Sequence, residues 1–131
     1  VVRVTGAAAM KVLWLLLMVC GVAQAQEWVE LTRTSNATVL VQAGASRAPS
    51  GKPAVWVYLD YARPEPNGAM STRAFIEADC AGMQTRMLAV TDHSQHRGGG
   101  SVVATSRPKD WEPVAPSTVT ARAWMYACTG K

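Results

Sequence analysis

The segment WEPVAPSTVTARAWMYAC, residues 111–128, decides the fold that we expect for this chain. Its first part predicts a rigid turn, because Pro113 and Pro116 fix their own backbone angles and lack an amide hydrogen. Ser117 is a residue type that caps helix N-termini, and from it the segment predicts a short helix that runs to Cys128. A helix of this length is marginal alone in water, so it must dock against another part of the chain.

The predicted helix has one apolar face. Thr120, Trp124 and Cys128 recur at intervals of four residues and therefore form one stripe. We expect this face to bury Trp124 and the neighbouring Met125 beside the cysteine. Gly130 then favours the end of the helix.

Residues 1–25 are interpreted as an export signal rather than as part of the fold. Lys11 precedes an apolar run, and the Ala-Gln-Ala sequence at 23–25 supplies the small residues that a signal peptidase accepts. Met10 indicates the true start of translation, which would make residues 1–9 an upstream mis-start. The mature chain is then residues 26–131, which we expect to form a single domain.

Two alternatives for the N-terminal segment involve a membrane. The apolar run is shorter than the about 20 residues of a membrane span, so a retained anchor is less favoured than cleavage. Cys20 is the candidate for lipid attachment, although bacterial lipoprotein signals place a small residue before the cysteine, where this chain has Val19. We expect membrane association only if Cys20 is lipidated.

Past this leader the chain has two cysteines, Cys80 and Cys128. Export implies an oxidising compartment, in which two cysteines of a small domain pair with each other. The sequence therefore predicts a Cys80–Cys128 disulfide, with two buried free thiols as the alternative.

Strand-like segments fill the chain between the leader and the helix. Their β-branched and aromatic residues alternate with polar ones, and turn-forming residues separate them. The six segments are Glu27–Thr32, Thr38–Gln42, Ala54–Tyr61, Thr72–Cys80, Met83–Thr91 and Ser101–Arg107. The connections are short and no helical pattern separates the strands. We therefore predict an α+β fold, an antiparallel sheet of about six strands with the C-terminal helix packed on one face and tethered by the disulfide.

One helix can cover only one face of such a sheet. Strand periodicity places Trp56 and Tyr58 on the face opposite Val55 and Val57, and Phe75 belongs with the two aromatic residues. An uncovered apolar face is normally an interface, so these three aromatic residues are the candidate interface. We expect contact between two copies of the chain, with recognition of another protein or coverage by loops as alternatives. Trp56→Ala or Tyr58→Ala should then lower self-association more than folding.

The charged residues give no sign of nucleic-acid binding. The formal net charge is +4, but two of the basic residues lie in the leader and the rest are scattered. Nucleic-acid binding requires a concentrated basic patch. We therefore exclude nucleic acid as a partner.

The residues also favour neither a metal site nor an enzyme. His93 and His96 are the only candidate metal ligands, and strand periodicity would place them on opposite sides of a solvated loop. There is no Gly-x-Ser-x-Gly motif, and the carboxylate pair Glu77 and Asp79 is more typical of a solvated strand edge than of an acid–base couple. We expect no cofactor, no metal and no catalytic residue.

Several of these segments together resemble the surface-adhesin protein E family, which are small exported proteins of Gram-negative bacteria. The resemblance rests on VWVYLDY at 55–61, Ser71 ahead of a strand ending in Asp79-Cys80, Gly99–Val103, Trp111–Ser117 and the terminal helix ending in cysteine. It implies a helix tethered to a sheet through Cys80 and Cys128, and it implies homodimers. The family is named for adhesion to host extracellular proteins, and no family binding motif can be placed on individual residues here.

We therefore expect an exported, non-catalytic protein-binding domain in the periplasm or on the outer cell surface. Its partner would be a host extracellular-matrix or plasma protein. The alternative is a periplasmic structural or envelope-assembly module without a host partner.

Overall fold

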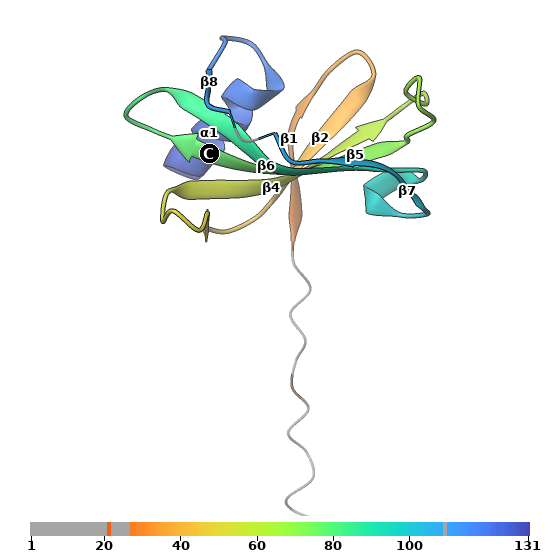
Figure 1. Ribbon diagram of the computed structural model, residues 1–131, viewed down its shortest axis with the longest axis horizontal. Helices are drawn as coiled ribbons and strands as arrows, with labels where there is room; N and C mark the ends of the chain where they lie inside the picture. The colour runs from red at the N-terminus through yellow and green to blue at the C-terminus, as the bar shows by residue number, and fades with distance from the viewer. Residues whose placement is uncertain (1–20, 22–26, 109) are drawn as a thin grey trace, which may run out of the picture.

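The computed structural model describes residue 21 and residues 27–108 and 110–131 (Figure 1). The predicted export signal and Cys20 lie outside this part of the chain. The elements are β1 (Trp28–Arg33), β2 (Ala37–Gln42), β3 (Ser46–Arg47), β4 (Pro53–Tyr61), β5 (Ser71–Asp79), β6 (Gln84–His93), the 3₁₀ turn η3 (His96–Gly98), β7 (Val102–Ser106), β8 (Glu112–Pro113) and α1 (Val119–Thr129). No helix in this part of the chain has the length and apolar character needed to cross a membrane.

The strands form one antiparallel sheet in the order β1-β2-β4-β5-β6-β7. The two-residue strands β3 and β8 add to β4 and β6. The helix α1 lies on one side of this sheet (Figure 1). The α+β prediction is therefore confirmed, and the six predicted strands agree with the structure to within a residue or two. The sequence missed β3 and β8 because two residues are too few to show a period.

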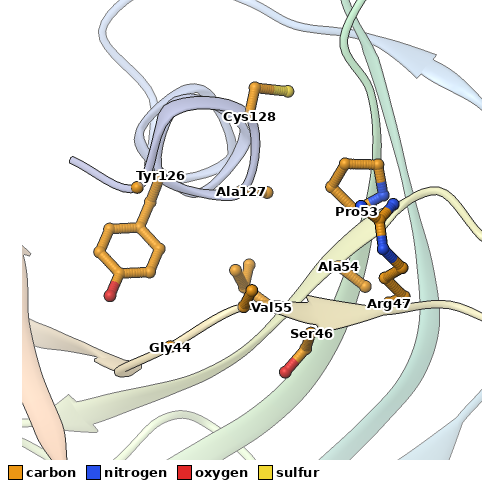
Figure 2. A pocket seen from close by; sticks show the side chains of 11 residues that line it. Gly44, Ser46, Arg47, Pro53, Ala54, Val55, Tyr126, Ala127 and Cys128 are labelled. Carbon is orange, nitrogen blue, oxygen red and sulfur yellow. The ribbon is translucent and has the colours of Figure 1, made fainter.

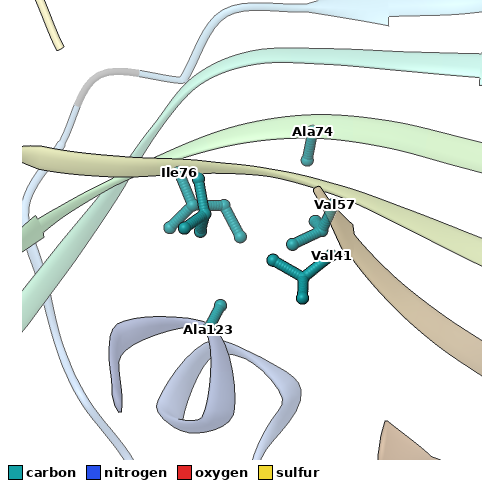
Figure 3. Packing of buried hydrophobic residues seen from close by; sticks show 6 residues of the cluster. Val41, Val57, Ala74, Ile76 and Ala123 are labelled. Carbon is teal, nitrogen blue, oxygen red and sulfur yellow. The ribbon is translucent and has the colours of Figure 1, made fainter. Parts of the chain in front are cut away.

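The hydrophobic core lies between α1 and the sheet face that it covers, which we call the inner face. Alternation along the central strands directs their small and β-branched side chains to this side. The buried cluster consists of Val41, Val55, Val57, Ala74, Ile76 and Ala123. Figure 3 shows Ala123 on the helix directed at the sheet residues of this cluster. Its small side chain lets the helix axis approach the sheet closely.

The helix docks through a different stripe from the one predicted. Ala123, Tyr126 and Ala127 face the core, whereas Trp124 is half-buried and Met125 is 43% exposed. The prediction that Met125 is buried was therefore wrong. The indole of Trp124 reaches the rim of the sheet, where its Nε1 donates a hydrogen bond of 2.9 Å to the carbonyl of Asp79.

The disulfide between Cys80 and Cys128 is confirmed, with the two Cα atoms 5.8 Å apart. Cys80 lies in the turn just after β5, and it is exposed rather than part of the buried face. The bond therefore ties the last turn of α1 to the rim of the sheet.

The ends of the helix follow local capping rules. Thr118, and not Ser117 as predicted, is the N-cap, and its hydroxyl accepts a hydrogen bond from the amide of Ala121 at 3.1 Å. Ser117 has a positive φ of 62° and belongs to the preceding turn. Gly130 ends the helix as predicted, with a left-handed φ of 78° and an amide that donates to the carbonyl of Tyr126.

Candidate functional site

The sheet face opposite α1, which we call the outer face, carries a group of aromatic side chains. Trp56 on β4 pairs with Phe75 on β5, and the two rings stack with their centroids 4.5 Å apart. Tyr58, two residues further along β4, contacts Trp28 of β1 with the ring centroids 4.3 Å apart. The structure thus brings the three predicted aromatic residues together, and it adds Trp28. Their role as an interface stays a prediction.

A cation lies among these rings. Arg73 pairs with Tyr58 across the strands, and its guanidinium carbon lies 4.1 Å from the centroid of Trp56 and 5.9 Å from that of Tyr58. The face of an aromatic ring attracts a cation through its quadrupole. Among the described residues, no carboxylate forms a salt bridge with Arg73, and its Nε has no hydrogen-bond partner.

We call Trp28, Trp56, Tyr58, Phe75 and Arg73 the aromatic patch. Sequence periodicity places Arg73 on the same face as Phe75, since the two are two positions apart on one strand. The contact with Trp28 was not accessible from the sequence, because it depends on the order of strands in the sheet. All five side chains are half-buried, so their rings remain partly available to a partner.

The loop before β7 closes one end of the patch. The hydroxyl of Ser71 donates to the carbonyl of Gln95 at 2.5 Å and accepts from the amide of Gly98 at 2.9 Å. The amide of Arg97 donates to Asp60 at 2.7 Å. Gly98 has a φ of +72°, and a Cβ atom at this position would lie 2.9 Å from Tyr58. The turn η3 therefore lies directly against the ring of Tyr58, and a larger residue at position 98 would require the ring or the turn to shift.

The two histidines differ in their surroundings. His93 pairs with Ser71 in the sheet, and its Nε2 is buried without a hydrogen-bond partner among the described residues. His96 lies in η3, is exposed, and places its Nδ1 3.7 Å from Asp60. The part of the chain that the structure describes contains no group of three or more side chains that could hold a metal ion.

At the other end of the outer face lies a buried carboxylate. The side chain of Glu77 is fully buried and accepts hydrogen bonds from Ser50 at 2.5 Å and from Arg86 at 2.6 Å. Burial by itself would raise the pKa of Glu77. The two hydrogen bonds, with the positive charges of Arg86 and Lys52, outweigh burial and hold the pKa below its ordinary value.

The prediction that Glu77 is solvated was therefore wrong, because Arg86 faces it from the next strand and the loop carrying Ser50 folds over it. The guanidinium of Arg86 also lies 4.6 Å from the ring centroid of Trp111. Glu77 thus ties the loop carrying Ser50 to the sheet, and its two oxygens accept from Ser50 and from Arg86.

A hollow of about 380 Å³ lies at the C-terminal end of α1, beside β3 and β4. Figure 2 shows Tyr126 and Ala127 on the helix above Val55 and Ser46. Arg47 is the only charged side chain among the described residues that line it, and this side chain donates a hydrogen bond of 2.7 Å to the carbonyl of Gly51. The described residues that line the hollow include no histidine, aspartate or glutamate that could act as a base. The aromatic patch is therefore the better candidate for a functional surface.

A comparison with known protein families finds one match. The model of the family Surface-adhesin protein E matches residues 28–129, which extend from the first residue of β1 to the last residue of α1. Neither the curated proteins nor the solved structures contain a match to this chain.

Proposed function

The chain belongs to the surface-adhesin protein E family, and on that premise we propose that it is an exported, non-catalytic domain that binds another protein through the aromatic patch. Family membership supports an adhesin-like protein with an exported or surface location. We propose in addition that the outer face makes the contact with the partner, that the chain has no catalytic activity, and that the partner belongs to the class named below.

The observation that carries this proposal is the placement of Arg73 on the rings of Trp56 and Tyr58. Aromatic residues and arginine are enriched at the centres of protein interfaces and carry much of their binding energy. A guanidinium held by cation–π contacts, with no carboxylate of the described residues beside it, retains donors for a partner. The neighbouring rings would supply apolar contact area around those hydrogen bonds.

We propose a host extracellular-matrix or plasma protein as the partner. The alternative is a component of the bacterial envelope, which would make the chain a structural or assembly module of the periplasm. Both alternatives predict the same contact surface, so the identity of the bound protein separates them.

The test is a binding experiment with the chain isolated after export. Purified matrix and plasma proteins are immobilised beside fractions of the bacterial envelope, and binding is followed by surface plasmon resonance. We expect Trp56→Ala and Arg73→Ala each to weaken binding about tenfold or more, as for residues at the centre of an interface. The thermal midpoint of each variant shows whether it is folded.

Arg63→Ala is the matched control, because Arg63 is an exposed arginine in the turn after β4. This variant should bind as the wild type does. Equal losses for Arg63→Ala and Arg73→Ala would contradict the proposed surface. Binding only to envelope fractions would replace the host partner with the periplasmic alternative.

A further inference from the structure

A groove of about 310 Å³ lies against the side of α1 that does not meet the hydrophobic core. Its other walls are the turn between β5 and β6 and the segment that leads into the helix. Small-molecule sites are typically clefts of about 300–1,000 Å³ with mostly apolar walls and a few polar groups. The apolar residues that line this groove are Met83, Val114, Pro116, Ala121, Trp124 and Met125.

Two methionines of this lining are open to solvent. Met83 is 57% exposed and Met125 is 43% exposed. Exposed apolar surface beside a polar rim marks ligand-binding grooves, and methionine is flexible enough to fit apolar ligands of different shape. Trp124 forms a firmer wall, because its single donor, Nε1, is already bonded to the carbonyl of Asp79.

The backbone fixes the walls of the groove. The φ angle is +52° at Met83 and +62° at Ser117, which are two of the three residues other than glycine with a positive φ in the described part of the chain. Such angles cost free energy for a residue with a side chain. The amide of Val114 donates a hydrogen bond of 3.0 Å to the carbonyl of Met83. Two of the walls are therefore joined to each other, and the groove is preformed.

Arg122 is the only charged residue among the described residues that line the groove. Its guanidinium donates one hydrogen bond to Sδ of Met125 at 3.3 Å and one to the carbonyl of Leu31 at 3.5 Å. An arginine has five N–H donors, so three are left without a partner among the described residues. No salt bridge of these residues includes Arg122. Its positive charge is therefore available to an anion.

We propose that this groove binds a small carboxylate with an apolar tail, a medium-chain fatty acid. The tail lies along Met83, Trp124 and Met125, and the carboxylate lies at Arg122. A guanidinium matches a carboxylate through two parallel N–H···O bonds. A neutral apolar ligand would leave these donors unused, and a cationic one would be repelled. The groove and the aromatic patch lie on opposite sides of the sheet, so this proposal does not rest on the proposed function.

The test compares octanoate with octanamide, which have the same tail and differ in the charge of the head group. The exported chain is labelled with ¹⁵N, and NMR titration follows the indole N–H of Trp124, identified by its loss in Trp124→Phe. Both compounds are kept below the concentration at which they aggregate. We expect octanoate to bind about fivefold more tightly than octanamide. Hexanoate, which is two carbons shorter, should bind several-fold more weakly than octanoate, since each buried methylene contributes up to about a factor of four.

Variants of Arg122 test the carboxylate contact. Arg122→Gln should weaken octanoate binding to the level of octanamide and leave octanamide binding unchanged, which also shows that the groove is intact. Arg122→Lys keeps the positive charge and should keep part of the preference for octanoate. Arg63→Gln is the matched control, because Arg63 is an exposed arginine outside the groove, and it should bind both compounds as the wild type does.

Met83→Asn tests the apolar wall. Asparagine adopts a positive φ more readily than most residues, so the turn keeps its conformation while the apolar side chain is lost. Both compounds should then bind several-fold more weakly. The matched control is Val102→Asn on β7, where the replaced apolar side chain is 56% exposed. This control should leave both affinities unchanged, and so should Trp56→Ala in the aromatic patch.

Any of four results would overturn the proposal. They are no shift of the Trp124 signal with millimolar octanoate, equal affinities for octanoate and octanamide in the wild type, an unchanged preference in Arg122→Gln, and unchanged affinities in Met83→Asn. None of these results bears on the aromatic patch. Conversely, a chain that binds octanoate but no protein partner would count against the proposed function alone.

Discussion

Replacing both cysteines, Cys80→Ala/Cys128→Ala, should lower the free energy of unfolding by roughly 4 kcal/mol. The bond joins residues separated by 48 positions. In the chain-entropy model, closing a loop of this size removes unfolded-state entropy equivalent to roughly 4 kcal/mol at 25 °C. A whole domain is stable by only about 5–15 kcal/mol, so the loss is a large share of the total.

The structure indicates that the variant keeps its native fold while losing this stability. Ala123 is fully buried against the sheet, and the indole of Trp124 donates to the carbonyl of Asp79 next to Cys80. These contacts hold α1 on the sheet without the covalent bond. The main effect should therefore be a gain in entropy of the unfolded chain, with the folded state changed little.

The assay is equilibrium unfolding in urea, followed by far-ultraviolet circular dichroism on the exported chain. With an m value of about 2 kcal/mol per M, the midpoint should fall by about 2 M. The wild type in the presence of a reductant should match the variant, because Cys80 is exposed and accessible to small reagents.

A midpoint that falls by less than about 0.5 M would refute the reasoning. So would a wild type whose unfolding is the same with and without reductant. Loss of all helical signal in the variant under native conditions would show that α1 depends on the bond for docking and not only for stability.

Three further predictions concern the sheet, the loop and the helix. The carboxylate of Glu77 has a lowered pKa in the folded state, so its contribution to stability is present above the ordinary carboxyl pKa and is lost as pH falls through the lowered value. Urea unfolding between neutral pH and about pH 3 should show this acid-dependent loss in the wild type and a smaller one in Glu77→Gln. Gly98→Ala should cost about 1–3 kcal/mol, measured by thermal unfolding, because the new Cβ would have a positive φ and lie 2.9 Å from Tyr58. Thr118→Ala should cost about 1 kcal/mol in the same assay through loss of the helix cap to Ala121, and Thr118→Ser should restore most of it.

Much of the fold could be predicted because its signals are local. Alternation along β4 assigns Val55 and Val57 to one face and Trp56 to the other, and the structure agrees. Two cysteines beyond the predicted export signal leave one intramolecular pairing, and that disulfide is present.

The errors arose where neighbours distant in sequence decide the environment of a residue. Glu77 looks solvated in its own strand, but Arg86 and Ser50 satisfy it in the interior. Met125 is apolar and close to the predicted stripe, yet the helix turns Ala123 to the sheet because the smaller side chain allows closer packing. The pattern of neighbouring residues in the sequence shows neither the burial of Glu77 nor which face of the helix meets the sheet.

Strand periodicity and cysteine number are properties of the chain alone, so they were enough to predict which side chains share a sheet face, where the strands lie and which cysteines pair. The contacts of Arg73 with the ring of Trp56 and of Trp28 with Tyr58, and the open edge at β7, were visible only in the folded molecule. These features depend on the order of the strands and on the distances between them, and hydrogen bonding between segments far apart in the chain sets that order.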